Sequence, residues 1–493
     1  MSTNKLFKSL KNTDQVKDSQ QNDTLIITST TTVNELLKIA NQRNITRENA
    51  FKIVSTLMEW SNHGKVQLSE FEMDKRFLNL CQLIGNVNKK HPAKNEARRQ
   101  HSIDELATFF GLTEVNEATK KVSDISLPEM IKVMTALAQK KRRPIPLLRS
   151  LAYNISRVSS TLTIKQSADL LYSMAILSFP DEVLMQKISS GLLETVPRTD
   201  KSPVIGSILT SLGLLRYKDQ PLLDTLSDWI DIHSEGMRPQ DLCAFLLTLA
   251  TVGYSPSNAD TLFQKVTNSL KESDMPSSLD WLDVVWSLVV LNQATTEQVS
   301  SVLDKQFITK LSDASCLNVA KQLKLLNINA AAQFLLSNYK GFLLDENSEI
   351  FNVILEKSKE RQEFTKAITD TLFSLLPSAS FLNLNVNTGM GFTLDAEFFV
   401  DSKCNPVSIE KASVNHDANR IAVLPRYYHD FCRGRQDPLG IAFLYSKLLE
   451  AKGYKVLVVP FTEYNPKDKL VTRVKYLSKQ IQSIAKNSSN INE

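Results

Sequence analysis

Apolar residues recur at helical spacing through the middle of the chain, and the pattern itself repeats. Five short apolar segments align with one another, at residues 134–138, 171–175, 209–213, 245–250 and 285–289. Within them, equivalent positions are held by Leu137, Met174, Leu212, Leu249 and Leu288, which are 37, 38, 37 and 39 residues apart. A nearly constant step of this length is typical of stacked supersecondary units.

Each aligned segment is followed by a turn signal, such as Phe179-Pro180, and then by a second amphipathic helix pattern, such as residues 222–229. This order predicts one helical hairpin per repeat of about 38 residues. A single hairpin cannot bury its own apolar face, so neighbouring hairpins must stack. We therefore expect an α-helical repeat array, a solenoid, over residues 24–312. Its extended concave surface suits either peptides or single-stranded RNA, and the spacing alone does not choose between them.

The pattern changes near the C-terminus to strand, helix, strand, helix. The expected elements are a strand at residues 421–424, a helix at 439–451, a strand at 455–459 and a helix from about Val471. Gly453 is expected to take the left-handed conformation that ends the first of these helices. The order predicts a small α/β domain after the mostly α-helical remainder.

Composition excludes several classes of protein. The 493 residues exceed what one core usually fills, and 42% hydrophobic with 23% charged residues is ordinary globular usage. No apolar run is long enough to cross a membrane, so we expect no membrane insertion. Only 14 glycines leave few positions for loops that cradle phosphates. The five cysteines form no C-x-x-C pair, which argues against a disulfide framework and a zinc ribbon.

Charge is unevenly distributed along the chain. Residues 420–493 carry 13 Lys and Arg against 6 Asp and Glu, a net of +7, whereas the rest of the chain has a net of −2. A local surplus of this kind is expected where one face meets a polyanion, although a solvated lysine-rich surface gives the same count. A second basic group lies in a predicted turn and is either a phosphate contact or a solvated loop: Lys140, Lys141, Arg142 and Arg143.

The N-terminal residues 1–23 combine lysines with a few apolar residues, which is the composition of either a disordered tail or a mitochondrial targeting segment. Asp14, Asp18 and the lack of arginine depart from the usual targeting pattern. Residues 481–493 are expected to be a second disordered tail.

Three blocks of sequence resemble the FAST kinase domain family, named after Fas-activated serine/threonine kinase. The first block comprises residues 323–332 and 339–341, and the second comprises residues 375–377 and 391–397 with Asp401. The third block runs from Arg420 to Leu477 and is similar to a RAP domain, with Leu439-Gly440, Gly453-Tyr454, Pro460 and Tyr464 among its matches. The resemblance implies a first FAST module at 313–370, a second at 371–415 and a RAP-like domain at 416–480.

This resemblance implies a protein of the mitochondrial matrix that binds, stabilises or processes organellar transcripts. The partners expected from it are single-stranded mitochondrial RNA and proteins of RNA processing. Kinase chemistry is disfavoured despite the family name, because the sequence contains no G-x-G-x-x-G, V-A-I-K, H-R-D, D-F-G or Walker motif. We expect no cofactor.

The resemblance also implies a restriction-endonuclease-like fold for the C-terminal domain, which makes a metal-dependent endoribonuclease an alternative function. Asp395 and Glu397 share one face of a predicted strand and are the candidate metal-binding carboxylates. On the next strand, Leu424 and Arg426 stand where acidic residues are expected, so half of the site is missing. His429 is a weak candidate for acid–base chemistry. Cys404, His416, His429 and Cys432 match no zinc template, and we predict no metal.

The leading hypothesis is therefore an RNA-binding protein that acts by binding rather than by catalysis. A peptide-binding helical scaffold remains a third possibility. Arginine binds phosphate through its fork of donors, and tyrosine offers a stacking face for bases. In the C-terminal region, we predict RNA contacts at Arg426, Tyr428, Arg433, Arg435, Lys447, Lys455 and Tyr464. Tyr454 and Tyr476 occupy apolar-periodic positions and are expected to be buried.

Overall fold

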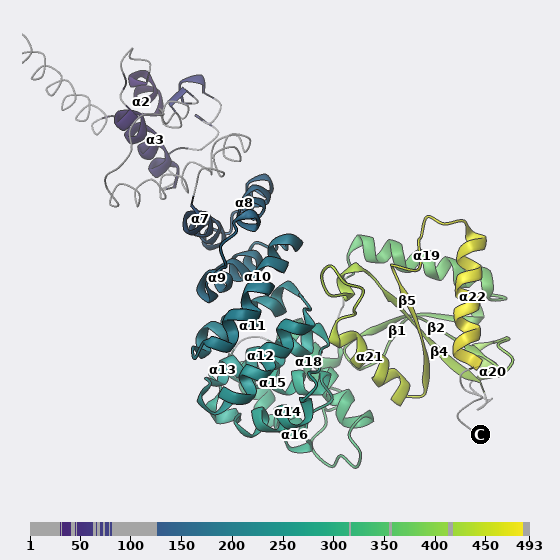
Figure 1. Cartoon of the computed structure of the whole chain (residues 1–493). Coiled ribbons are helices and arrows are strands. Elements are labelled where there is room, and N and C mark those ends of the chain that lie inside the picture. Colours follow the sequence, from purple (N-terminus) through teal and green to yellow (C-terminus); the bar gives the residue numbers. More distant parts are fainter. Residues whose placement is uncertain are drawn as a thin grey trace, which may run out of the picture. The chain divides into compact units, whose positions relative to one another are not determined.

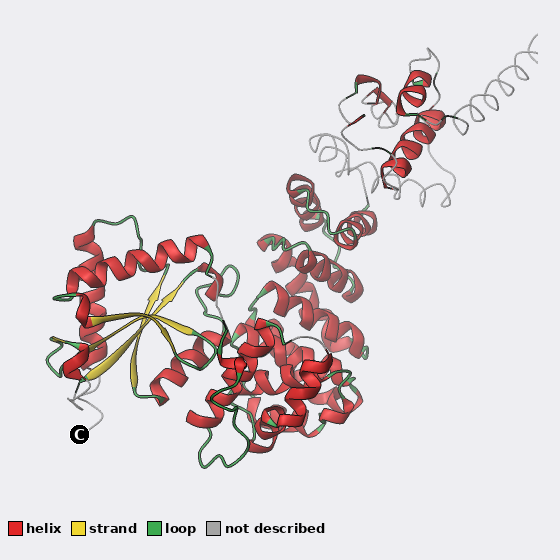
Figure 2. Cartoon of the chain, turned by 180° about the vertical axis from the view of Figure 1, so that it is seen from behind, coloured by secondary structure: helices red, strands yellow, loops and turns green. Residues whose placement is uncertain are grey.

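The chain is mostly helical, with a small mixed sheet near its C-terminal end (Figures 1 and 2). The computed structural model describes residues 30, 32–40, 45, 47–62, 66, 70–71, 74–77, 79–80, 126–314, 317–353, 357–412 and 418–486. The tail or targeting segment predicted at 1–23 lies outside the described residues, as do residues 487–493 and His416 of the weak zinc set. The second tail was predicted to begin at residue 481, but residues 481–486 are the last residues of a helix, α22 (Leu470–Lys486). None of the helices within those ranges has the length and apolar character needed to span a membrane.

The chain divides into two compact units, one of residues 1–137 with 144–151 and the other of residues 138–143 with 152–493. In the first unit, α2 (Val33–Ile39) and α3 (Arg47–Asn62) bury Leu36, Ile53 and Leu57 in one small core. Phe71 and Phe77 belong to the same core and meet edge to face, with ring centroids 5.1 Å apart. The helices α7 (Leu127–Gln139) and α8 (Ile145–Arg157) straddle the boundary between the units.

Two rows of helices form the helical region of the second unit. The first row packs in chain order and consists of α9 (Ile164–Ile176), α11 (Ser202–Leu215), α13 (Pro239–Val252), α15 (Ser278–Val290) and α18 (Val319–Phe334). Between them in the sequence lie α10 (Glu182–Thr195), α12 (Gln220–His233), α14 (Ala259–Asn268), α16 (Thr296–Leu303) and α17 (Lys305–Ala314). Of these, α10, α12 and α14 pack against one another in order and form the second row.

The first four helices of the first row, α9, α11, α13 and α15, end in the same backbone motif. The amide groups of Phe179, Tyr217, Tyr254 and Gln293 donate to the carbonyls of Met174, Leu212, Leu249 and Leu288, respectively. A bond of this span, together with a left-handed residue before the donor, defines the Schellman ending of a helix. The left-handed residues are Ser178, Arg216, Gly253 and Asn292, with φ between 47° and 61°.

The carbonyls that accept these bonds belong to the residues that the sequence aligns, and all four side chains are buried. Lys141, after α7, also has a positive φ of 51°, so five left-handed residues follow one another at steps of 37, 38, 37 and 39 residues. The sequence spacing thus coincides with the ends of the helices. The solenoid over residues 24–312 stays a prediction.

The sheet has the strand order β1 (Leu382–Asn387), β2 (Thr393–Val400), β4 (Asn419–Arg426) and β5 (Tyr454–Pro460), with β3 (Pro406–Val407) beside β2. The first three strands of this order are antiparallel, and β4 and β5 are parallel. A parallel pair needs a crossover, which α21 (Gly440–Ala451) supplies. A short helix, α20 (Ile409–Ala412), follows β3.

One face of the sheet is covered by α19 (Lys359–Leu375) and α22 (Leu470–Lys486). The core on this face includes Ile368, Phe398, Val423, Leu457 and Leu477. The opposite face meets α21, because side chains alternate along a strand and Arg426 reaches this helix.

The strand–helix–strand–helix order predicted for residues 421–471 is confirmed by β4, α21, β5 and α22. Gly453 has a φ of +87°, as expected for the residue that ends α21. The endonuclease-like character of this domain stays a prediction.

The helical region and the sheet region meet with backbone against backbone at one point. A Cβ atom on Gly440, the first residue of α21, would lie 1.9 Å from the carbonyl oxygen of Ala250 near the end of α13. A Cβ on Gly253 would lie 3.0 Å from Gly440 itself. Any side chain at position 440 would therefore push the two regions apart.

We expect Gly440→Ala to lower the free energy of unfolding by about 1–3 kcal/mol, as overpacking of a tight contact usually does. Gly236→Ala is the matched control, because a Cβ there meets no atom within 4 Å. Denaturant unfolding followed by tryptophan fluorescence measures both variants. Equal stability of the two would contradict the close contact.

Candidate nucleic-acid interface

Residues 427–437, which we call the basic loop, connect β4 to α21 and carry four of the predicted site residues. The loop is held in shape by its own polar groups. The amide of Tyr427 donates to the Asp430 carboxylate over 2.8 Å, and Arg361 from α19 forms an ion pair with the same carboxylate at 3.0 Å. Because β4 and β5 are parallel, the loop lies at the sheet edge where ligands of α/β proteins usually bind.

The basic loop is bound to the ends of two helices of the first row. The amide of Arg433 donates to the carbonyl of Arg216 at the end of α11 over 2.9 Å. In return, the Arg216 guanidinium donates to the carbonyl of His429 over 2.6 Å. The thiol of Cys432 contacts the carbonyl of Val252 at the end of α13 at 3.5 Å. The helical region therefore fixes the position of the loop arginines.

Lys218 strengthens the same junction from inside. Its side chain is only 8% exposed, donates to the carbonyl of Gly253 and lies 3.6 Å from the carboxylate of Asp437. A buried ammonium group needs such partners, because burial without them is costly. Lys218 is therefore a structural residue of the junction rather than a free surface cation.

Arg216 is a site residue that the sequence analysis missed. It is left-handed, with a φ of 54°, in the position that Gly253 occupies at the end of α13. Glycine is the usual residue there, because other side chains strain this conformation. The sequence did carry a signal, because an arginine stands at a repeat position where glycine is favoured. This position can be recognised only once the ends of the helices are known.

Tyr428 and Arg435 are exposed on the basic loop, and Arg433 is partly buried beside Tyr428. The Tyr428 side chain is 46% exposed, and its hydroxyl accepts a 2.8 Å hydrogen bond from Arg433. The Arg433 guanidinium lies 5.7 Å from the centre of the same ring. Arg435 is exposed, and its charge partly opposes the rise of the Tyr217 pKa to about 12, which burial causes. Together with Arg216 these side chains form what we call the arginine cluster.

His429, the weak acid–base candidate, is also exposed on this loop, and its ring meets Tyr428 edge to face with centroids 5.3 Å apart. Cys432 is 3% exposed, and burial raises the pKa of its thiol to about 11. Its sulfur therefore stays protonated near neutral pH.

Arg426 does not belong to the exposed cluster, which corrects the expectation of a direct RNA contact. Its guanidinium donates to the carbonyl of Ala442 over 3.0 Å and to the hydroxyl of Ser446 over 2.9 Å, both in α21. Burial lowers the pKa of Arg426, and only the nearby Asp430 opposes this shift. The residue binds α21 to the sheet.

Tyr464 is a second correction. The side chain is 2% exposed, and its hydroxyl donates to the carbonyl of Ala367 over 2.7 Å and lies 2.8 Å from the hydroxyl of Thr371. A base cannot stack on a ring that is enclosed by the core between α19 and the sheet. The sequence could not separate this tyrosine from an exposed one, because it lies in a short loop without periodicity.

The other predicted cations are on different elements. Lys447 is exposed on α21, and Lys455 is half-buried on β5. In the turn between α7 and α8, Lys140, Lys141, Arg142 and Arg143 are exposed, and Arg143 donates to the carbonyl of Ser178 over 2.9 Å. Tyr454, expected to be buried, is 5% exposed, and Tyr476 is partly buried.

The two candidate metal-binding carboxylates are buried and already paired. Glu397 is 3% exposed and accepts hydrogen bonds from Arg420, Tyr454 and Asn383 at 2.9–3.1 Å. Burial and this carboxylate raise the pKa of Tyr454.

Asp395 is 5% exposed and forms an ion pair with Lys357. A metal ion needs carboxylate oxygens that are free to coordinate it. Within the described residues, no group of three or more His, Cys, Asp or Glu side chains could hold a metal ion.

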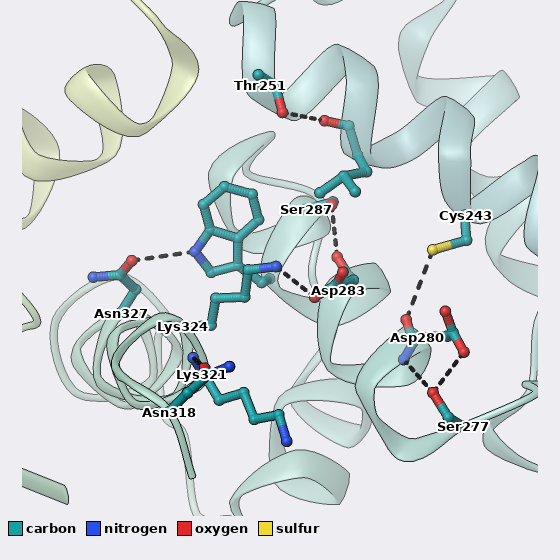
Figure 3. Close-up of polar contacts among 12 residues, drawn as sticks. Cys243, Thr251, Ser277, Asp280, Asp283, Ser287, Asn318, Lys321, Lys324 and Asn327 are labelled. Atoms are coloured by element: carbon teal, nitrogen blue, oxygen red, sulfur yellow. Dashed lines mark hydrogen bonds and ion pairs between the residues drawn. The ribbon is translucent and has the colours of Figure 1, made fainter. Parts of the chain in front are cut away.

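A second set of polar contacts joins α15, α18 and the hairpin between β1 and β2. Figure 3 shows the contacts between α15 and α18. The Trp286 indole donates to the side-chain oxygen of Asn327 over 3.1 Å, and the amide nitrogen of Asn327 donates to the carbonyl of Met390 over 2.7 Å. Lys324 forms an ion pair with Asp283 at 2.5 Å. Burial raises the pKa of Asp283 although Lys324 opposes the shift. Asn327 is 2% exposed, so it connects three elements from within the protein.

We predict a structural role for Glu397. Arg420→Met should lower the free energy of unfolding by about 3 kcal/mol, because it leaves the buried Glu397 carboxylate without its charged partner. Glu397→Gln combined with Arg420→Met should recover most of the loss in a double-mutant cycle measured by denaturant unfolding. Loss of a magnesium-dependent ribonuclease activity in Glu397→Gln, with unchanged stability, would contradict this role.

Comparison with known proteins gives two family matches. Residues 242–312, which span α13 to α17, match the family described as FAST kinase-like protein, subdomain 1. Residues 322–408, from α18 to the end of β3, match FAST kinase-like protein, subdomain 2. Both ranges begin closer to the N-terminus than the modules that the sequence motifs predict at 313–370 and 371–415. The contact between Trp286 and Asn327 therefore joins the two matched subdomains.

Similar curated proteins cover most of the chain. FAST kinase domain-containing protein 4 of Homo sapiens is 29% identical over 429 residues, which are 83% of this chain and 64% of that protein. The same-named protein of Rattus norvegicus is 25% identical over 78% of this chain and 64% of its own length. FAST kinase domain-containing protein 3, mitochondrial, of Rattus norvegicus is 22% identical over 77% of this chain and 58% of its own length.

The chain thus spans about 64% of the length of the first of these relatives. The two subdomain matches follow one another in the expected order, and the relatives carry the same family name. Both motifs, at residues 323–332 and 391–397, fall within the subdomain 2 match, so the assignment of residues 323–332 to the first module is corrected. Residues 242–312 and 322–408 thus match the FAST kinase-like protein family, and the chain is similar to FAST kinase domain-containing proteins over most of its length.

Proposed function

We propose that this protein binds single-stranded RNA in mitochondria and regulates the stability or processing of organellar transcripts. The observation that carries the proposal is the arginine cluster. Arg433 lies beside the exposed ring of Tyr428, Arg216 donates to the carbonyl of the next loop residue, and Arg435 is exposed on the same loop. Two regions of the chain build this cluster together, and backbone hydrogen bonds fix its geometry. A fixed group of cations next to a stacking face is what an unpaired nucleic-acid strand requires.

The chemistry of these side chains favours RNA over a peptide. Guanidinium groups bind phosphate oxygens in pairs, and each neutralised phosphate releases counterions. An exposed tyrosine stacks on any base, which contributes about 1–3 kcal/mol per base by alanine substitution. A cation near the C-terminal end of a helix is also stabilised by the carbonyl groups there. This effect accounts for the presence of Arg216 at the end of α11, but it does not account for the exposed Arg435.

The mitochondrial location is proposed from the relatives. Rat protein 3 and mouse protein 2 of this family carry the word mitochondrial in their names. We extend this location to the present chain and place it in the matrix, where organellar transcripts are found. The RAP-like domain at 416–480 is part of the same proposal, and its basic loop supplies most of the cluster.

An endoribonuclease that uses Asp395 and Glu397 has less support, because both carboxylates are engaged with cations of the protein. That function would require magnesium-dependent cleavage that disappears in Asp395→Ala. A peptide-binding scaffold would require an affinity that does not change with salt concentration.

We expect Arg433→Ala combined with Arg435→Ala to weaken the binding of a fluorescent single-stranded oligoribonucleotide. The slope of log affinity against log salt should shrink by about 1.4, which is 0.7 for each lost phosphate contact on a single strand. Fluorescence anisotropy across a salt series measures both quantities.

The matched control for this double variant is Lys271→Ala with Lys305→Ala. It removes two exposed cations that lie before α15 and at the start of α17. The control should keep the wild-type slope. An identical slope for both double variants would contradict the proposed role of the arginine cluster.

Tyr428→Ala should weaken RNA binding by roughly tenfold, which corresponds to one lost stacking contact, and should leave the salt slope almost unchanged. Tyr428→Phe should retain most of the affinity, since the ring remains although the hydroxyl contact with Arg433 is lost. The same anisotropy assay distinguishes them. If the phenylalanine variant were as weak as the alanine variant, the hydroxyl rather than the stacking face would be the important group.

A further inference from the structure

A second group of cations lies between β5 and the middle of α22. Lys467 and Lys469 precede the helix, and Lys475 and Lys479 lie one turn apart along it. All four side chains are exposed. None of them makes an ion pair within the part of the chain that the structure describes. We call this group the α22 lysine surface.

Folding alone gives no reason for these lysines. The helix contributes Leu477 and Ile481 to the core, and its opposite face needs only polar residues of either charge. Instead, α22 contains no acidic residue at all. Lysines four residues apart repel each other, and lysines before the first turn oppose the helix dipole. A local electrostatic conflict of this kind is expected at functional surfaces.

The α22 lysine surface is connected to the arginine cluster along one edge of the sheet. Both the basic loop and the β5–α22 segment leave the carboxyl ends of the parallel strands β4 and β5. Phe461, the first residue after β5, meets the ring of Tyr428 edge to face with centroids 6.0 Å apart. Its amide also donates to the carbonyl of Arg426 over 2.9 Å. The second segment therefore begins in contact with the first.

The first half of α22 is also held against the segment that follows β5. The Tyr476 hydroxyl donates to the carboxylate of Glu463 over 2.9 Å, which holds the helix against the segment that follows β5. In Figure 1 the chain passes from β5 through this segment into α22 beside the sheet. The lysines therefore project from a supported element.

We propose that a single strand of RNA bound at the arginine cluster continues along this edge and across the α22 lysine surface. This inference rests on the proposed RNA-binding function and extends it to a longer stretch of RNA. The surface supplies phosphate contacts, while Tyr428 and the three arginines hold the adjoining nucleotides. The protein thus distinguishes long unpaired segments from short ones.

An anionic membrane fits the surface less well. A helix that lies on a membrane needs a broad apolar face turned outward. The apolar face of α22 is instead packed on the sheet through Leu477 and Ile481. Outside it, the exposed large apolar residues of this helix are Leu470 and Val471, both in its first turn.

The test uses the full chain with four substitutions: Lys467→Ala, Lys469→Ala, Lys475→Ala and Lys479→Ala. Its affinity for a 30-nucleotide single-stranded RNA should fall at least tenfold, and the salt slope should shrink by about 2.8, or 0.7 per phosphate contact. The affinity for a short RNA of about six nucleotides, which fills only the arginine cluster, should change less than threefold. Circular dichroism verifies that the variant is folded.

The matched control also removes four exposed lysines, by Lys271→Ala, Lys305→Ala, Lys359→Ala and Lys366→Ala. It should bind both RNAs as the wild type does. If the α22 variant also binds both RNAs as the control does, while the Arg433 and Arg435 variant loses affinity, the path across α22 is wrong and the proposed function stands. If the wild type binds neither RNA, both proposals fail.

Binding of an anionic membrane is tested with the same variants, by using vesicles of phosphatidylcholine with one third phosphatidylglycerol. The four α22 substitutions should leave vesicle co-sedimentation unchanged. If they abolish co-sedimentation and spare the affinity for the long RNA, the lysines serve an anionic lipid surface, and the inference is overturned.

Discussion

The end-on contact between the helical region and the sheet region is the interaction on which the site depends. Helices α11 and α13 stop at left-handed residues, and their last carbonyls then face the loop that follows β4. Backbone groups make this contact on both sides, because Gly253 and Gly440 leave no side chain between them. Cations gather where these helix ends meet the loop, and the hydrogen bonds of the junction hold them at fixed positions.

The sequence predicted the elements around this contact better than the contact itself. Spacing located the ends of α9, α11, α13 and α15, because in each of them a buried apolar residue is followed four positions later by the left-handed residue of a Schellman ending. Alternation and Gly453 located β4, α21 and β5. These features are local in the chain. The approach of position 216 to position 433 crosses more than two hundred residues, and no local pattern records it.

Predictions of site residues were wrong where the same residue type occurs both inside the fold and at the surface. Arg426 ends β4 and donates to α21, whereas Arg433 lies farther along in the basic loop and donates to the exposed Tyr428. Tyr428 and Tyr464 differ in the same way, one exposed and one enclosed. Sequence gives the chemistry of such a side chain, whereas its exposure is decided by which helix covers that face of the sheet.

The acidic residues of β2, which could in principle bind a metal ion, instead stabilise the sheet through contacts with other side chains. Glu397 is bound by an arginine, a tyrosine and an asparagine, and Asp395 is bound by a lysine. Each carboxylate is paired with a cation, so this network has no net charge and stabilises the sheet. The arginine cluster, in contrast, carries a positive charge at the carboxyl ends of the parallel strands. The division favours a protein that holds RNA over one that cleaves it.

Ultraviolet crosslinking of the intact protein to single-stranded RNA, followed by mass spectrometry of the adducts, tests this account most directly. We expect the main RNA-bearing peptides to contain Tyr428 or the neighbouring residues of the basic loop. Adducts confined to the second-row helices α12 and α14, with none on the basic loop, would contradict it.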